Sequence, residues 1–107
     1  MECKVVFVDQ KLKSNFESLK DSDPRLYKEI NRALVEVSKN VFFGRAVKKD
    51  LIPKNFIKKY KIDNLWIYNL RKDWRLLYSV GKDEVEIIAV VLDWMSHKDY
   101  ENLFSFS

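Results

Sequence analysis

The stretch NLWIYNLRKDWRLLYSV, residues 64–80, decides the fold. Its apolar pattern before and after Arg71-Lys72-Asp73 predicts two β-strands, 65–70 and 74–80, joined by a charged turn. Because successive side chains of a strand point to opposite faces, one face of this hairpin is rich in aromatic residues. We expect that face to pack on helices and the opposite face to be accessible. The first face carries Trp66, Tyr68, Leu70, Trp74, Leu76, Tyr78 and Val80, and the second carries Asn69, Arg71, Arg75 and Ser79.

The other elements follow outward from the hairpin. The β-branched run at 4–8 predicts a buried strand, and the residues after it predict two helices, one capped by Asp9 and one that begins at Pro24. We further expect a short helix at 54–60, a tight turn at Gly81-Lys82-Asp83, a strand at 85–92 and a closing helix within 96–104. The order β-α-α-β-β-β-α predicts one α+β domain over residues 1–107, with a mainly antiparallel sheet packed on two N-terminal helices.

Composition excludes several classes of protein. The 107 residues include one cysteine, Cys3, and one histidine, so neither an internal disulfide nor a structural zinc site is expected. The longest apolar run, IIAVVL at 87–92, is too short to span a bilayer, and charges at the start of the chain argue against a signal peptide. We therefore expect a cytoplasmic protein that uses no metal, no cofactor and no membrane.

Positive charge is concentrated in residues 44–62. This segment has seven of the 20 cations and one of the 16 acids, which gives it a net charge of +6 and leaves −2 for the rest. Its cations are Arg45, Lys48, Lys49, Lys54, Lys58, Lys59 and Lys61. Such clustering is typical of a surface that binds RNA, DNA or another polyanion, although a lysine-rich surface kept for solubility has the same pattern.

Three motifs together resemble the RelE/ParE toxin superfamily. They are Arg71, the run WRLLY at 74–78 and the run HKDY at 97–100, and the resemblance extends over residues 4–104. It implies a RelE-like fold and the toxin component of a type II toxin–antitoxin system, with a cognate antitoxin as partner. RelE-like and YafQ-like members are mRNA interferases, which cut mRNA on the ribosome without a metal ion.

The resemblance also implies roles for individual residues. In this chemistry the 2′-hydroxyl of RNA attacks the adjacent phosphate, so a base, an acid and a cation are needed. Arg75 matches a transition-state stabiliser, Arg71 could bind a flanking phosphate, and His97 and Tyr100 match the positions of catalytic residues in the superfamily. Apolar side chains beside the cations could form a groove for the antitoxin, or they could simply be buried in the core. These side chains are Leu65, Ile67 and Leu77.

A second interpretation stays open. RelE has lysines on the strand before the first arginine, but Ile67 and Asn69 stand at the matching positions here, and neither side chain can act as a base. This departure favours a non-catalytic or ParE-like member that binds protein or nucleic acid. The hairpin arginines could also pair with local acids, and His97 could be an ordinary surface residue.

Overall fold

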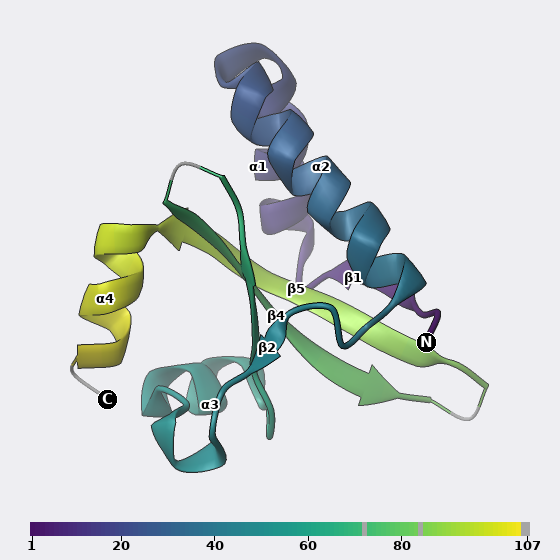
Figure 1. Ribbon diagram of the computed structural model, residues 1–107, viewed down its shortest axis with the longest axis vertical. Coiled ribbons are helices and arrows are strands. Elements are labelled where there is room, and N and C mark those ends of the chain that lie inside the picture. The colour runs from purple at the N-terminus through teal and green to yellow at the C-terminus, as the bar shows by residue number, and fades with distance from the viewer. Residues whose placement is uncertain (72, 84, 106–107) are drawn as a thin grey trace.

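One mixed sheet organises the protein (Figure 1). The structure, a computed structural model, describes residues 1–71, 73–83 and 85–105. In these residues the sheet has five strands in the order β1-β5-β4-β3-β2, with β1 parallel to β5 and the other neighbours antiparallel. The strands are β1 (Lys4–Phe7), β2 (Arg45–Ala46), β3 (Trp66–Asn69), β4 (Trp74–Lys82) and β5 (Ile87–Ser96). The helices are α1 (Gln10–Ser22), α2 (Pro24–Lys39), the 3-10 turn η1 (Lys49–Leu51), α3 (Lys54–Tyr60) and α4 (His97–Ser105).

The predicted starts of the first two helices are confirmed. Asp9 caps α1 by accepting a hydrogen bond from the backbone N–H of Leu12 at 2.8 Å. Asp23 caps α2 in the same way, from the N–H of Leu26 at 3.2 Å. Pro24 occupies the first turn of α2, where its missing N–H costs no helical hydrogen bond. The α+β fold and the predicted order of elements are therefore confirmed, with β2 and η1 added between α2 and α3.

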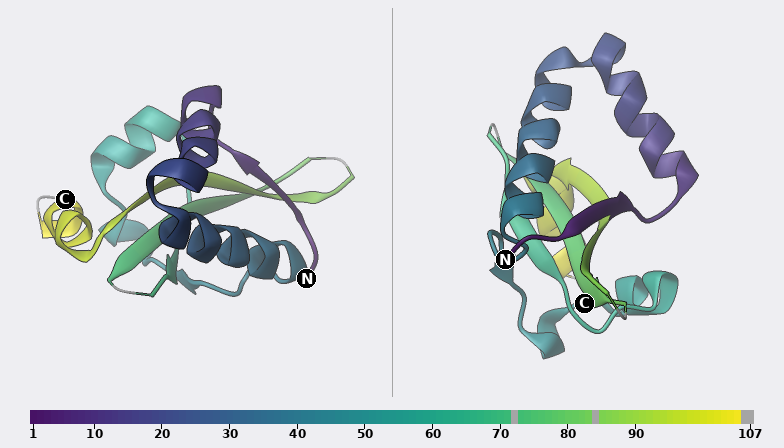
Figure 2. Two further views of the ribbon diagram at one scale, coloured as in Figure 1. Left: turned by 90° about the horizontal axis from the view of Figure 1, so that it is seen from above. Right: turned by 90° about the vertical axis from the view of Figure 1, so that its right-hand side faces the viewer.

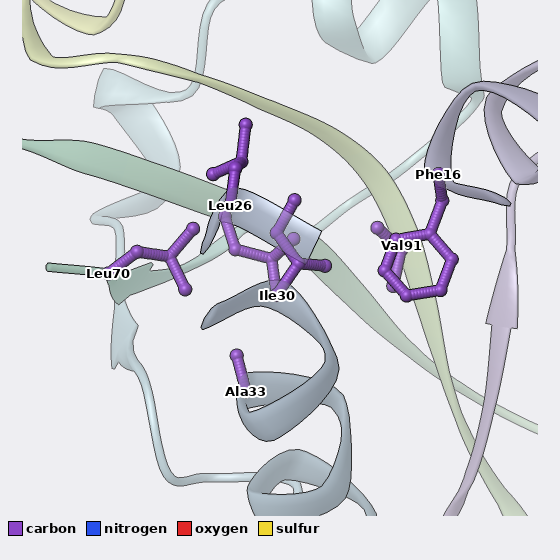
Figure 3. Packing of buried hydrophobic residues seen from close by; sticks show 7 residues of the cluster. Phe16, Leu26, Ile30, Ala33, Leu70 and Val91 are labelled. Atoms are coloured by element: carbon purple, nitrogen blue, oxygen red, sulfur yellow. The ribbon is translucent and has the colours of Figure 1, made fainter. Parts of the chain in front are cut away.

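The helices α1 and α2 cover one face of the sheet (Figures 1 and 2). Figure 3 shows Ile30 and Ala33 of α2 next to Leu70, with Phe16 of α1 beside Val91 of β5. The aromatic-rich face of the hairpin packs against these helices, as predicted, because Tyr68, Trp74 and Leu76 belong to the same cluster and Trp66 and Tyr78 to its neighbour.

The opposite face is not open in the way that the sequence predicted. Leu65, Ile67 and Leu77 are buried in a cluster with Ile52 and Phe56, and side chains of α4 pack at its margin. The proposed antitoxin groove on these three residues is therefore wrong. Ser79, expected on the surface, is buried as well. The cause is the basic segment itself, since Ile52, which precedes α3, and Phe56, which lies within it, both pack against the sheet.

The turn between β4 and β5 also differs from the prediction. Gly81 and Lys82 continue β4 and pair with β5, so Gly81-Lys82-Asp83 is not the turn. The carboxylate of Asp83 instead accepts hydrogen bonds from the backbone N–H groups of Val85 and Glu86. This side-chain cap places the reversal after residue 82 and moves the start of β5 to Ile87.

The first hairpin lies where expected, although Lys72 of the predicted turn lies outside the described residues. Asp73 adopts a positive φ of 64°, a left-handed conformation that aspartate tolerates better than most residues. Its carbonyl accepts a hydrogen bond from the backbone N–H of His97. The turn is thereby fixed against the start of α4. No helix in the described residues is long and apolar enough to cross a membrane.

The buried hydroxyl of Tyr78 holds the segment that leads into β2. It accepts a hydrogen bond from the backbone N–H of Gly44 at 3.0 Å and donates one to the carbonyl of Val41 at 2.8 Å. We expect Tyr78→Phe to lower the free energy of unfolding by about 2 kcal/mol, because both backbone groups lose their partner. Urea denaturation measures the change. Tyr60→Phe is the matched control, since its hydroxyl has no such bond among the described residues, and an equal loss in both variants would contradict this account.

Candidate functional site

The strand register brings the predicted site residues to one face of the sheet. Asn69 of β3 pairs with Arg75 of β4, and Arg75 pairs with Met95 of β5. Directly opposite residues in a sheet project to the same side, so these side chains form one row. Because α4 follows β5 without a gap, His97 lies at the end of this row.

Arg75 and His97 are in direct contact. The Nη2 atom of Arg75 lies 3.0 Å from Nδ1 of His97, and Nη1 donates to the carbonyl of Trp74 at 3.1 Å. The Nε atom of Arg75 is buried and has no hydrogen-bond partner among the described residues. A buried donor without a partner is costly, so it requires an explanation, and a role in binding or catalysis is one.

The contacts of His97 define which ring nitrogen carries the hydrogen. A guanidinium can only donate, so Nδ1 must accept from Arg75 with its lone pair. The other nitrogen, Nε2, lies 2.6 Å from the carboxylate of Glu101, one helical turn along α4. This arrangement fits an imidazole that is protonated on Nε2 and offers a basic nitrogen on the side of Arg75.

Tyr100 completes the cluster from the same helix. Its hydroxyl accepts a hydrogen bond from Nη2 of Arg45 at 2.8 Å, and the guanidinium carbon of Arg75 lies 5.6 Å from its ring centroid. The rings of His97 and Tyr100 are nearly parallel, with centroids 6.3 Å apart. We call Arg45, Arg75, His97, Tyr100 and Glu101 the α4 cluster. It offers two cations, one imidazole and one hydroxyl on a single surface.

Arg71 lies on the opposite side of the sheet from the α4 cluster. Its Nε atom is 3.7 Å from a carboxylate oxygen of Glu29 on α2, and its side chain is 70% exposed. Together with Arg25, Leu26 and Trp74 it lines a small cavity of about 180 Å³ on the α1–α2 face. The structure therefore does not bring the two hairpin arginines together.

The cations of the basic segment are all on the surface. Besides Arg45 of the α4 cluster, they are Lys48, Lys49, Lys54, Lys58, Lys59 and Lys61, and among the described residues none of these lysines forms a salt bridge. The segment adjoins the α4 cluster, because Ile52 and Phe56 share a core with Tyr100 and other residues of α4. Exposed cations of this segment thus lie near the cluster, and cations of this kind can hold a phosphate backbone.

Asp93 is the carboxylate on this face of β5, opposite Leu77 in the register. Burial raises its pKa above the ordinary value, and the nearby Asp99 raises it further, while a bond from the N–H of Trp94 and the charge of Lys59 lower it. The folded protein therefore binds the Asp93 proton more tightly than the unfolded chain does. This favourable contribution to stability is present below the ordinary pKa of aspartate and is lost as the pH rises through the raised value.

We accordingly expect Asp93→Asn to be more stable than the parent protein at neutral pH. Asparagine has the same shape and an oxygen that can accept from the N–H of Trp94, but it carries no charge to desolvate. Urea denaturation of both proteins at about pH 3 and about pH 7 measures the effect. The advantage of the variant should grow toward pH 7, and an advantage that shrinks would contradict the assignment.

The described residues hold no group of three or more His, Cys, Asp or Glu side chains arranged to bind a metal ion.

Comparison with known proteins identifies the fold. No family model and no curated protein matches the chain. A solved structure described as the YoeB/ParE toxin from Agrobacterium tumefaciens is similar to it, with a TM-score of 0.61 and 18% sequence identity. The alignment covers 88% of this chain and 98% of that chain. The chain has a RelE/ParE-like fold. At this sequence identity the similarity supports the fold alone, and a shared fold does not by itself imply a shared function.

Two features of the site were missed by the sequence analysis. Glu101 stands four residues after His97, a spacing that places both side chains on one side of a helix and could have indicated the pair. The bond from Arg45 to Tyr100 joins residues 55 positions apart, and no local pattern could have predicted it. β2 is the edge strand beside β3, whereas α4 packs against β5 and β4, so the long side chains of Arg45 and Tyr100 join two separate parts of the sheet.

Proposed function

We propose that this protein is the toxin component of a toxin–antitoxin pair, and that it cleaves mRNA on the ribosome, in the cytoplasm, without a metal ion. Two findings support the proposal: the fold likeness to a YoeB/ParE toxin, and the α4 cluster. The observation that carries it is the 3.0 Å contact between Arg75 and His97, which pairs a phosphate-binding group with a base. The toxin is held inactive by a cognate antitoxin protein.

In the reaction, the RNA phosphate binds the guanidinium of Arg75, whose fork of N–H groups matches two phosphate oxygens. Its Nη2 atom turns from His97 to the phosphate and frees the lone pair of Nδ1. That nitrogen takes the proton of the 2′-hydroxyl as the 2′ oxygen forms a bond to phosphorus. Glu101 stabilises the positive charge that develops on the imidazole, as it accepts from Nε2–H.

The bond from phosphorus to the 5′ oxygen then breaks. Tyr100 donates the hydroxyl proton to this leaving oxygen, since its hydroxyl already accepts from Arg45 and has its own hydrogen to give. Arg75 stabilises the extra negative charge on phosphorus in the transition state. The products are a 2′,3′-cyclic phosphate and a 5′-hydroxyl, and the charge of the basic segment holds the strand in place.

Induction of the protein in a bacterial host tests the proposal. We expect translation to stop and transcripts to be cut, with 5′-hydroxyl ends that sequencing can map. A double variant, Arg75→Ala with His97→Ala, controls for the burden of expression and should give neither effect. Intact transcripts during growth arrest by the parent protein would reject the nuclease function.

The second candidate is a binding protein of ParE-like type that does not cut RNA. It is favoured by β3, where Ile67 is buried and Asn69 is neutral, so this strand supplies no base or cation. Growth arrest with intact transcripts, retained when His97 is replaced by alanine, would support it.

A further inference from the structure

A groove lies at the edge of the sheet next to the α4 cluster. It has a volume of about 310 Å³ and forms where the chain before β2 moves away from β3. Its lining residues are Phe43, Gly44, Arg45, Ile67, Tyr68 and Asn69. Gly44 is required for this approach, because a Cβ atom there would lie 2.6 Å from the carbonyl oxygen of Ile67.

One wall of the groove is a rigid aromatic surface. The ring of Phe43 is stacked on that of Tyr68, with centroids 5.5 Å apart and an angle of 24° between the planes. The hydroxyl of Tyr68 donates a hydrogen bond to the carboxylate of Glu36 at 2.6 Å, which fixes the Tyr68 ring to α2. Phe43 is 54% exposed, so this pair presents a flat apolar surface to solvent. Unpaired nucleobases stack on exposed aromatic rings of this kind.

The other wall supplies hydrogen-bonding groups. Asn69 is exposed, and its carboxamide offers both donors and an acceptor, as an amide that reads the edge of a base must. Asn69 is the direct cross-strand partner of Arg75, and directly opposite side chains are about 5 Å apart at Cβ. Arg45 lines the groove and also contacts Tyr100. The groove therefore passes around the edge of the sheet, from the α2 side, where Phe43 and Tyr68 stack, to the side of Arg75, where the scissile phosphate would bind.

We propose that this groove binds an unpaired nucleobase of the RNA substrate, from the nucleotide next to the scissile phosphate. The base stacks on Phe43, Asn69 hydrogen-bonds to its edge, and Arg45 holds the phosphate between the groove and the α4 cluster. The proposal rests on the proposed function for the position of the phosphate. It deepens that function, because it makes Phe43 and Asn69 the residues that determine sequence preference.

Binding of RNA that cannot be cleaved tests the site separately from catalysis. The probes are four short single-stranded homopolymers, one for each base. Their 2′-O-methyl groups remove the attacking hydroxyl. Their binding to the purified protein is followed by fluorescence anisotropy. We expect Phe43→Leu to weaken binding about 5- to 100-fold, the loss of one stacked base, and Phe43→Tyr to keep it. Asn69→Ala should reduce the differences among the four probes.

Phe42→Leu is the matched control. Phe42 is also exposed, at 48%, but its ring packs on Trp66 and does not line the groove. Equal losses in Phe42→Leu and Phe43→Leu would overturn the proposal, because they would indicate a general apolar surface for a protein partner. Unchanged binding in Phe43→Leu, or no binding by the parent protein, would overturn it as well. Base-dependent binding without RNA cleavage in cells would reject the proposed nuclease and keep the site.

Discussion

Substitution of His97 by alanine is expected to slow RNA cleavage by about 10²- to 10⁴-fold, the range of a lost general base. His97 is the only histidine of the chain, and its Nδ1 atom is the one basic nitrogen that the α4 cluster presents beside Arg75. The rate should be measured on ribosome-bound mRNA in a purified translation system, by primer extension. Since His97 is half-exposed, the variant should fold normally, and its unfolding curve should overlay that of the parent protein.

Two further variants distinguish a catalytic imidazole from a merely structural one. Lys98→Ala changes the next residue of α4, which is exposed, and should leave the rate nearly unchanged. Glu101→Gln keeps an oxygen that can accept from Nε2–H but removes its negative charge, so we expect an intermediate loss. Cleavage by His97→Ala at the parent rate would place the base elsewhere and reject the mechanism.

The sequence predicted the local elements well because their signals are local. Asp9 and the pair Asp23-Pro24 fix two helix starts through bonds to residues three positions away. The aromatic-rich face of the hairpin followed from alternation alone. The turn after β4 was misplaced because Gly81 suggested it, whereas the carboxylate of Asp83 caps the backbone that follows.

The sequence of the hairpin does not indicate which segment covers the second face of the sheet. The basic segment was interpreted by its charges, but its apolar residues Ile52 and Phe56 decide where it lies. Their packing buries Ile67 and Leu77 and leaves the lysines on the outside. The basic segment thus has an apolar side in the core and charged side chains in solvent, and of the two alternatives for Leu65, Ile67 and Leu77 the structure shows burial.

The separation of the two hairpin arginines is likewise a result of strand geometry. Arg71 lies beyond the end of β3 and contacts α2, whereas Arg75 is within β4 and faces α4. Alternation along the two strands predicted both arginines on one accessible face, with Arg71 at a flanking phosphate. The structure instead joins Arg75 to Arg45, which comes from the basic segment, through the ring and hydroxyl of Tyr100.

Replacement of Arg75 by lysine is expected to reduce cleavage by about 10²- to 10³-fold, although the positive charge is retained. A lysine ammonium is a point charge, and it cannot present the two parallel N–H groups with which a guanidinium holds a phosphate. It also cannot lie over the Tyr100 ring and contact Nδ1 of His97 at once. The same primer-extension assay measures the rate, and urea denaturation should show no loss of stability, because lysine removes the unpaired buried Nε.

Arg71→Lys is the matched control for Arg75→Lys. Both substitutions make the same chemical change in the same hairpin, but Arg71 lies on the α1–α2 side, away from the α4 cluster. If cleavage depends on a guanidinium at the phosphate, Arg71→Lys should keep most of the activity while Arg75→Lys loses it. Activity retained in both variants would indicate that the hairpin acts through its total charge, and the assignment of Arg75 as the transition-state stabiliser would then fail.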